Sequence, residues 1–427
     1  MSNNINIRRQ LLNALKRGTG EAYLIVKNNP NIDFSTQIIK GALNIFAYDG
    51  QCEGNRAQYI FDIISISKQK TKIKKAVLRG LAREQDETWN LTHLFALAKL
   101  FATQGDGAAK KTMYDRFLNP PIEYSDWVGA SEILALDGLE GLFYVAEKFG
   151  QYIEKNPDDC QDDSIIEAFQ AKNEQIKVYT ALKKQAKTNK YIAIYLKNIK
   201  RTQKNEEKYQ EKNKTIPRKY EDIIDEVLNS KPFFGFRRQF NMTDEGVNQI
   251  AKRLMVETNT SNIEKLLYIF DCYKFPYDSQ IILDFAKQKP TRKNRIVEFA
   301  ICALKHLKSQ DIRNFFIEKI ENAKNPIDYL EILMANYESG DHKILNAIAH
   351  KTNNEHKIEQ LAIIYTDIYS ENSTKECQEP LEILYYKMNC AIHRNSIVKI
   401  LIENEVLSAK IKSEIEFDCD LDTRELA

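Results

Sequence analysis

Residues 294–320 read NRIVEFAICALKHLKSQDIRNFFIEKI, and this stretch decides the fold class. Its first half places six apolar residues on one helical face: Ile296, Phe299, Ala300, Ala303, Leu304 and Leu307. Apolar residues three and four positions apart share a face because an α-helix has 3.6 residues per turn. The turn Ser309-Gln310-Asp311 is rich in helix-capping residues. A second apolar stripe then follows, at Ile312, Phe316, Ile317 and Ile320. The stretch predicts two antiparallel helices joined by a short turn.

The same theme returns along the rest of the C-terminal half. Further pairs are predicted at 327–338 with 342–350, at 357–369 with 380–387, and at 397–403 with 409–417. Equivalent helices recur roughly every 30 to 45 residues, which is the range of helical repeat proteins. A single pair cannot bury its apolar face alone, so neighbouring pairs must stack.

Composition agrees with a helical chain. The 427 residues include only 15 Gly and 10 Pro, against roughly 30 and 21 at average usage. No Asn-Gly or Asp-Gly turn lies between alternating apolar runs, which is the signal of a β-hairpin. We therefore predict an all-α protein, a right-handed α-solenoid of stacked antiparallel helix pairs.

The N-terminal half is less regular but helical in pattern. Helices are predicted at 40–48, 55–66, 70–83, 88–102, 108–117, 130–136 and 138–153, separated by breaks rich in Gly, Pro or Asp. The loop 156–163 contains Pro157 and four Asp, and it is typical of a domain end. We predict an N-terminal repeat domain at 1–157, a long basic helical connector at 158–218 and a C-terminal repeat domain at 219–427.

The turn at 307–313 resembles the inter-helix turn of a HEAT/armadillo repeat. In that family an Asp caps the second helix, and a following Arg pairs with the next repeat. Residues 420–427 resemble the same turn. The resemblance implies that Asp311, Arg313, Asp422 and Arg424 set the spacing of repeats and have no catalytic role.

Two segments concentrate positive charge, although the whole chain carries a net charge of only +2. Residues 172–219 contain fifteen Lys or Arg against four Glu. On the polar side of this segment lie Lys183, Lys187, Lys190, Lys197 and Arg201, and 202–215 has the composition of a linker. The segment is interpreted as a solvated helix and tether, or as an anion-binding ridge for nucleic acid.

A second basic stripe lies at 68–83, at spacings of three and four residues: Lys68, Lys72, Lys75, Arg79 and Arg83. Ile73, Val77, Gly80 and Leu81 form the opposite face. Like charges on one face repel one another unless an anion or acidic groups lie alongside. The stripe is either a solvated outer face or a surface for phosphates.

Three polar sites are candidates for chemistry. Trp89-Asn90 resembles the Trp-Asp pair that lines the DNA groove of HEAT-like alkylpurine DNA glycosylases, but here Asn90 replaces the carboxylate. A buried Trp89 that anchors the repeat is the other interpretation. Cys52, within residues 48–56, lacks a nearby His, so a glycine-rich turn with Asp49 and Asn55 as helix caps is preferred to a nucleophile. Residues 136–140 are interpreted as a helix cap.

Other patterns exclude function classes. The seven Cys include no CxxC pair, so neither a disulfide framework nor a structural zinc site is expected. No HExxH, GxxxxGK[ST], GxGxxG or GxSxG motif occurs. No leader or membrane-spanning run is visible, and a cytoplasmic protein is expected.

We predict a non-catalytic scaffold that binds a partner protein or its own copy, without metal, membrane or small-molecule cofactor. The alternative is a nucleic-acid-binding solenoid that uses residues 68–83 and 172–219.

Overall fold

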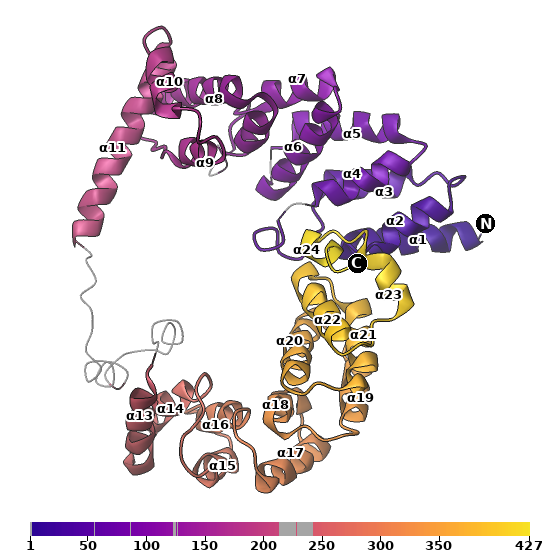
Figure 1. Ribbon diagram of the computed structural model, residues 1–427, viewed down its shortest axis with the longest axis vertical. Helices are drawn as coiled ribbons and strands as arrows, with labels where there is room; N and C mark the ends of the chain where they lie inside the picture. The colour runs from indigo at the N-terminus through magenta and orange to yellow at the C-terminus, as the bar shows by residue number, and fades with distance from the viewer. Residues whose placement is uncertain are drawn as a thin grey trace. The chain divides into compact units, whose positions relative to one another are not determined.

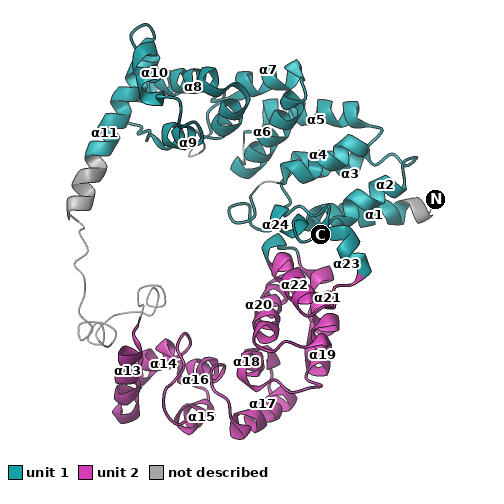
Figure 2. Ribbon diagram, in the orientation of Figure 1, with its two compact units in different colours: residues 1–215, 389–392, 409–427 teal, residues 216–388, 393–408 magenta. Residues whose placement is uncertain are grey.

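The computed structural model describes residues 2–54, 56–85, 87–122, 125, 127–212, 228 and 242–427. Within these residues the protein is all-α, as the sequence predicted, with 23 α-helices and no strand (Figure 1). Helices account for 70% of the structure. Two compact units divide the chain (Figure 2). Unit 1 comprises residues 1–215, 389–392 and 409–427, and unit 2 comprises residues 216–388 and 393–408.

Unit 1 begins with eight helices that pack in two rows. Their bounds are α1 Ser2–Arg17, α2 Glu21–Asn28, α3 Ser35–Leu43, α4 Ala57–Ile66, α5 Lys70–Arg83, α6 Thr88–Thr103, α7 Gly107–Arg116 and α8 Ala130–Lys155. Contacts join α1, α3, α5 and α7 in sequence, and we call these helices the first row. Contacts likewise join α2, α4, α6 and α8, which form the second row.

The apolar core of unit 1 lies between these rows. Helix α5 contributes Ile73, Val77 and Leu81, all fully buried, as its sequence pattern predicted. Gly80 lets α3 approach α5, because a Cβ atom at this position would lie 2.5 Å from Leu43 Cδ2. Helix α8 contains a break at Gly138, whose φ of 55° is left-handed and favours glycine. The sequence pattern also predicts a break here, between helices at 130–136 and 138–153.

Beyond α8 the chain continues into α9 Ser164–Lys172, α10 Val178–Gln185 and α11 Lys190–Lys212. These helices lie in the predicted basic connector, but they pack on α8 and belong to unit 1. Buried Ile192, Tyr195 and Ile199 form the apolar stripe of α11, and Tyr195 packs against Phe149 of α8. Residues 213–218 of the predicted connector lie outside the described part of the chain.

The C-terminal residues 409–427 pack on the first helices of unit 1. This segment contains α23 Ala409–Ile415 and α24 Leu421–Arg424. Phe417 stacks on Tyr23 of α2 with ring centroids 4.1 Å apart, and the Cys419 N–H donates to the Gly18 carbonyl at 2.8 Å. Only glycine fits at position 20, since a Cβ there would lie 1.8 Å from the Glu414 carbonyl oxygen. The two ends of the chain therefore share one core.

The described part of unit 2 contains shorter helices and two 3₁₀ helices. The elements are α13 Asp244–Val256, α14 Thr260–Ile269, α15 Gln280–Ala286, α16 Ile296–Leu304, α17 Gln310–Asn322, η2 Pro326–Ile332, α18 Leu333–Asn336, α19 His342–Lys351, α20 Glu355–Glu371, η3 Lys375–Cys377, α21 Gln378–Lys387 and most of α22 Ala391–Glu403. Helix α16 contacts α14, α15 and η2, and α20 contacts η2, α18 and α21. The two helices predicted at 294–320 are present as α16 and α17, but α17 packs on η2 rather than on α16.

The predicted HEAT-like residues have partly different roles in the structure. Arg313 does pair with the next helix pair, through Asp341, with nitrogen–oxygen distances of 2.7 and 2.6 Å. The cap of α17 is Ser309, whose hydroxyl accepts from the Ile312 N–H, so the prediction that Asp311 is the cap was wrong. At the C-terminus Asp420 caps α24, and Arg424 reaches Asp62 of α4 at 2.8 Å.

Two predicted helices differ in their bounds or type. The helix predicted at 40–48 is α3, which begins at Ser35, since the Asp33 carboxylate accepts from the Ser35 N–H and caps this turn. The segment predicted as one helix at 327–338 is the 3₁₀ helix η2 followed by the single turn α18. Pro326 starts η2 and supplies no N–H to a preceding turn.

Candidate binding surfaces

Helix α5 presents its predicted basic stripe on the side away from the core. Lys75, Arg79 and Arg83 are exposed, whereas Ile73, Val77 and Leu81 of the same helix are buried. Within the described residues, no carboxylate forms an ion pair with Lys75, Arg79 or Arg83. Helix α5 contains no acidic residue of its own. These three cations therefore face solvent without an internal counter-charge.

The first row as a whole is basic. Its four helices contain fourteen Lys or Arg and one acidic residue, Asp115, which pairs with Lys111. The second row contains seven acidic residues and four Lys. Six exposed cations of the first row have no ion-pair partner within the described residues, and we call them the basic face: Arg9, Lys16, Lys40, Lys75, Arg79 and Arg83. Charge is thus separated between two rows that share one core.

Two residues at the start of the predicted stripe are already engaged. Lys68 donates to the Asn31 side chain at 2.9 Å. Lys72 donates to the Ser35 hydroxyl at 2.9 Å and lies 3.9 Å from the Asp33 carboxylate. They hold the loop between α2 and α3, and we leave them out of the basic face.

The second basic segment lies elsewhere in unit 1. Helices α10 and α11 pack on α8, and Figure 1 shows α11 at the other end of unit 1 from α5. Lys190 pairs with Glu154 at 3.0 Å, and Arg201 donates to the carbonyls of Pro157 and Asp159. The other three predicted residues of this segment, Lys183, Lys187 and Lys197, are exposed and form no ion pair with the described residues. The two predicted stripes do not converge.

Trp89 and Asn90 hold a loop. The Asn90 side-chain oxygen accepts from the Ile45 N–H at 2.8 Å, across from α6 to the loop after α3. The Trp89 ring packs against Gly50, where a Cβ would lie 3.1 Å from the ring. Glu87 caps α6 by accepting from the Asn90 N–H. Trp89 is half-buried, so it holds a loop and is not the buried anchor that the other interpretation expected.

Cys52 lies in a turn that its neighbours organise. The Asp49 carboxylate accepts from the backbone N–H groups of Gln51 and Cys52 at 2.8 and 3.1 Å. The same carboxylate raises the pKa of the Cys52 thiol, by hydrogen bonding and by its charge. An activated thiol needs the opposite shift. Asn55, the other predicted cap, lies outside the described residues.

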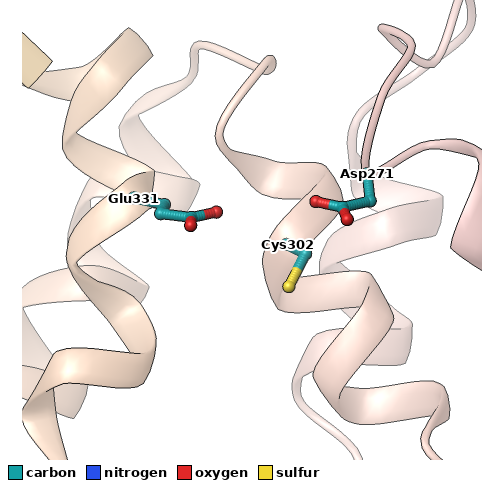
Figure 3. Close-up of side chains that lie close together, drawn as sticks. All are labelled: Asp271, Cys302 and Glu331. Carbon is teal, nitrogen blue, oxygen red and sulfur yellow. The ribbon is translucent and has the colours of Figure 1, made fainter. Parts of the chain in front are cut away.

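Unit 2 brings together three side chains that the sequence analysis did not connect. Asp271 follows α14, Cys302 lies on α16 and Glu331 on η2 (Figure 3). Their ligand atoms lie within 4.8 Å of one another, and the described residues hold this one cluster with enough such atoms for a metal ion. The Lys305 ammonium binds Asp271 at 2.8 Å and Glu331 at 3.1 Å. An internal cation therefore already bridges the two carboxylates.

A cleft opens beside this cluster, between α16, η2 and α20. Its volume is about 410 Å³. Four apolar residues are part of its lining: Val297, Ile301, Ile327 and Ile364. Glu298, Asp328 and Glu331 line it as well, together with Arg295. Arg295 pairs with Glu298 of its own helix, so its charge is already compensated.

Two acidic groups in and beside the cleft have raised pKa values. Loss of solvent raises the pKa of Asp328 and the neighbouring Glu298 adds to this shift, whereas the hydrogen bond from Asn325 and then the charge of Lys357 oppose it. Loss of solvent and Glu331 likewise raise the pKa of Asp367, and Lys305 opposes this shift. Shifted acids in a cleft are a mark of a functional site. No sequence motif joins Asp328 and Asp367, because they come from two separate elements, η2 and α20.

Within the described residues, no helix combines the length and apolar content that a bilayer span needs. A scan against models of known protein families and a search of curated proteins found no match to the chain.

Proposed function

We propose that this protein is a non-catalytic helical-repeat protein, a HEAT-like solenoid in its stacking, that binds the backbone of nucleic acid through the basic face of its first row. The carrying observation is the charge difference between the rows. Exposed cations without acidic neighbours repel one another, and an external polyanion relieves that repulsion.

The geometry of α5 suits a line of phosphates. Lys75, Arg79 and Arg83 are four residues apart, so their Cα atoms rise about 6 Å from one to the next along the helix. Lys40 of α3 and two residues of α1 extend the same charge to the neighbouring helices. Contacts of this kind neutralise phosphates without reading bases, so binding without strong sequence preference is expected.

The inference that the protein is not an enzyme has its own support. Cys52, the thiol that the sequence raised as a nucleophile, has a raised pKa. Trp89 and Asn90 are engaged in holding a loop. Their contacts suit packing, and base excision would need the carboxylate that Asn90 replaces.

Fluorescence anisotropy tests the proposed binding. Labelled duplex DNA, single-stranded DNA and structured RNA are titrated with the full chain at two salt concentrations. Each phosphate neutralised contributes about −0.9 to the slope of log K against log salt for duplex DNA, so three to six contacts give a steep loss of affinity.

A matched pair of variants locates the site. Lys75→Glu, Arg79→Glu and Arg83→Glu together should abolish binding to the probe. The control is Lys183→Glu, Lys187→Glu and Lys197→Glu, which changes the charge by the same amount at exposed positions of α10, α11 and the turn between them. The proposal fails if the wild-type chain does not bind at low salt, or if both triple variants bind equally.

A second candidate, a scaffold for a partner protein, has one specific observation in its favour. Trp127 is 46% exposed, beside a cleft of about 350 Å³ between α8 and α9 that Leu134 and Phe169 line. An exposed Trp next to an apolar cleft is typical of a protein-binding hot spot. Capture experiments from nuclease-treated extract with wild type and Trp127→Ala test it. A protein captured only by the wild type favours the scaffold, and identical captured sets contradict it.

A further inference from the structure

The cleft of unit 2 carries charge of the opposite sign to the basic face of unit 1. Asp328 and Glu331 are three residues apart on η2, and residues i and i+3 of a 3₁₀ helix lie one above the other. Both line the same cleft. Glu298 of α16 faces the cleft as well. Carboxylates from two elements thus meet around one hollow.

The internal cations do not balance these carboxylates. Arg295 is used by Glu298, and the single Lys305 ammonium is shared between Glu331 and the buried Asp271. Asp328 accepts a hydrogen bond from the Asn325 amide, and the charge of Lys357 acts on it. The four carboxylates therefore stand against two ion-paired cations, Arg295 and Lys305, and the charge of Lys357.

The apolar part of the lining decides what kind of cation fits. Ile301, Ile327 and Ile364 line the cleft together with the carboxylates. A hydrated metal ion gains nothing from apolar lining, and Lys305 already occupies the position between Asp271 and Glu331. An ammonium on an aliphatic stem matches both parts, because its methylene groups pack on apolar surface while its charged end stays polar.

We propose that this cleft binds an alkylammonium group, with Asp328 and Glu331 as its carboxylate partners and Ile301, Ile327 and Ile364 against its methylene groups. The group comes either from a free aliphatic diamine or from a lysine side chain of another protein. The volume of about 410 Å³ lies within the usual range of small-ligand sites. The site is independent of the nucleic-acid face proposed above.

Isothermal titration calorimetry of the full, nucleic-acid-free chain tests the proposal with three probes. Cadaverine represents the free diamine, an acetylated and amidated Gly-Lys-Gly peptide represents the lysine side chain, and pentanediol is the uncharged control. Saturable binding of cadaverine or the peptide with a Kd of about 1 mM or tighter, without binding of pentanediol, is expected. Tighter binding of cadaverine indicates a free diamine as the source, and tighter binding of the peptide indicates a lysine side chain of another protein.

Asp328→Asn with Glu331→Gln should weaken that binding by about tenfold or more. The control, Glu318→Gln with Glu321→Gln on exposed positions of α17, removes the same charge from unit 2 and should leave the affinity unchanged. The proposal is overturned if neither charged probe binds at about 10 mM, if pentanediol binds equally, or if the control weakens binding as much. Anisotropy with nucleic acid should be the same for the cleft variant and wild type, so a failure here is distinct from a failure of the basic face.

Discussion

Arg313 in unit 2 and Arg79 in unit 1 lie on helices of similar length but serve different ends. Arg313 is 9% exposed and binds the Asp341 carboxylate through two nitrogens, and it also donates to the Asn336 carbonyl. Arg79 is exposed and has no described ion pair. The difference lies in the partner, because the Asp341 carboxylate before α19 binds Arg313, whereas no carboxylate of the described residues pairs with Arg79.

This comparison separates cations that hold the fold from cations that are available to a partner. Removing the partner of Arg313 should cost stability and leave binding to nucleic acid intact. Changing the basic face should do the reverse.

Asp341→Ala should have the largest effect. It leaves the Arg313 guanidinium buried without its counter-charge, which costs about 3–5 kcal/mol of unfolding free energy. Urea denaturation measures this change.

Glu338→Ala is the matched control for that variant. Its carboxylate lies 3.5 Å from the Arg313 Nε atom but is 61% exposed, so the loss should stay below about 1 kcal/mol. Equal effects of the two variants would show that Arg313 is not a buried structural cation.

His93 of α6 should make unit 1 sensitive to acid. Burial lowers the pKa of His93 from 6.5 to about 4. Between these pH values the unfolded chain binds a proton that the folded chain does not, so stability falls as the pH falls, by roughly 3 kcal/mol. Urea denaturation at pH 7 and pH 4.5 compares wild type with His93→Gln, which lacks this group. If both lose stability equally over that range, His93 is not responsible.

Ser309→Ala should cost about 1 kcal/mol, because its hydroxyl caps α17. Asp311→Ala, within the same turn, should cost less than about 0.5 kcal/mol, since Asp311 forms no side-chain hydrogen bond or ion pair among the described residues and its charge acts on the helix dipole. Thermal or urea unfolding of the two variants orders them. A larger loss for Asp311→Ala would restore the capping role that the sequence resemblance implied.

The sequence pattern was enough to predict those elements whose bounds depend on residues close together in the chain. The range of α5 was predicted to the residue, because its apolar stripe and its charges have one period. The break at Gly138 was also predicted from the sequence, and the structure shows a left-handed φ there, which glycine favours. Helix α3 was misplaced because its start depends on the Asp33 cap, which outweighs the apolar pattern further on.

Long-range features could not be predicted from one sequence. Asp271, Cys302 and Glu331 follow one another at intervals of about thirty residues, and only the packing of three parts of the chain brings them together. The C-terminal residues that pack on Gly18 and Tyr23 show no local sign of that contact. The charge difference between the rows became visible only when the helices were assigned to rows.

One comparison tests the central claim, that the basic face serves a partner and not the fold. The Lys75→Glu, Arg79→Glu, Arg83→Glu variant is measured for urea stability and for anisotropy with labelled RNA and DNA, beside the α10–α11 control. We predict a stability within about 0.5 kcal/mol of wild type, as for other exposed charges, and loss of binding that the control retains. A variant that unfolds, or one that binds as well as the control, would contradict the claim.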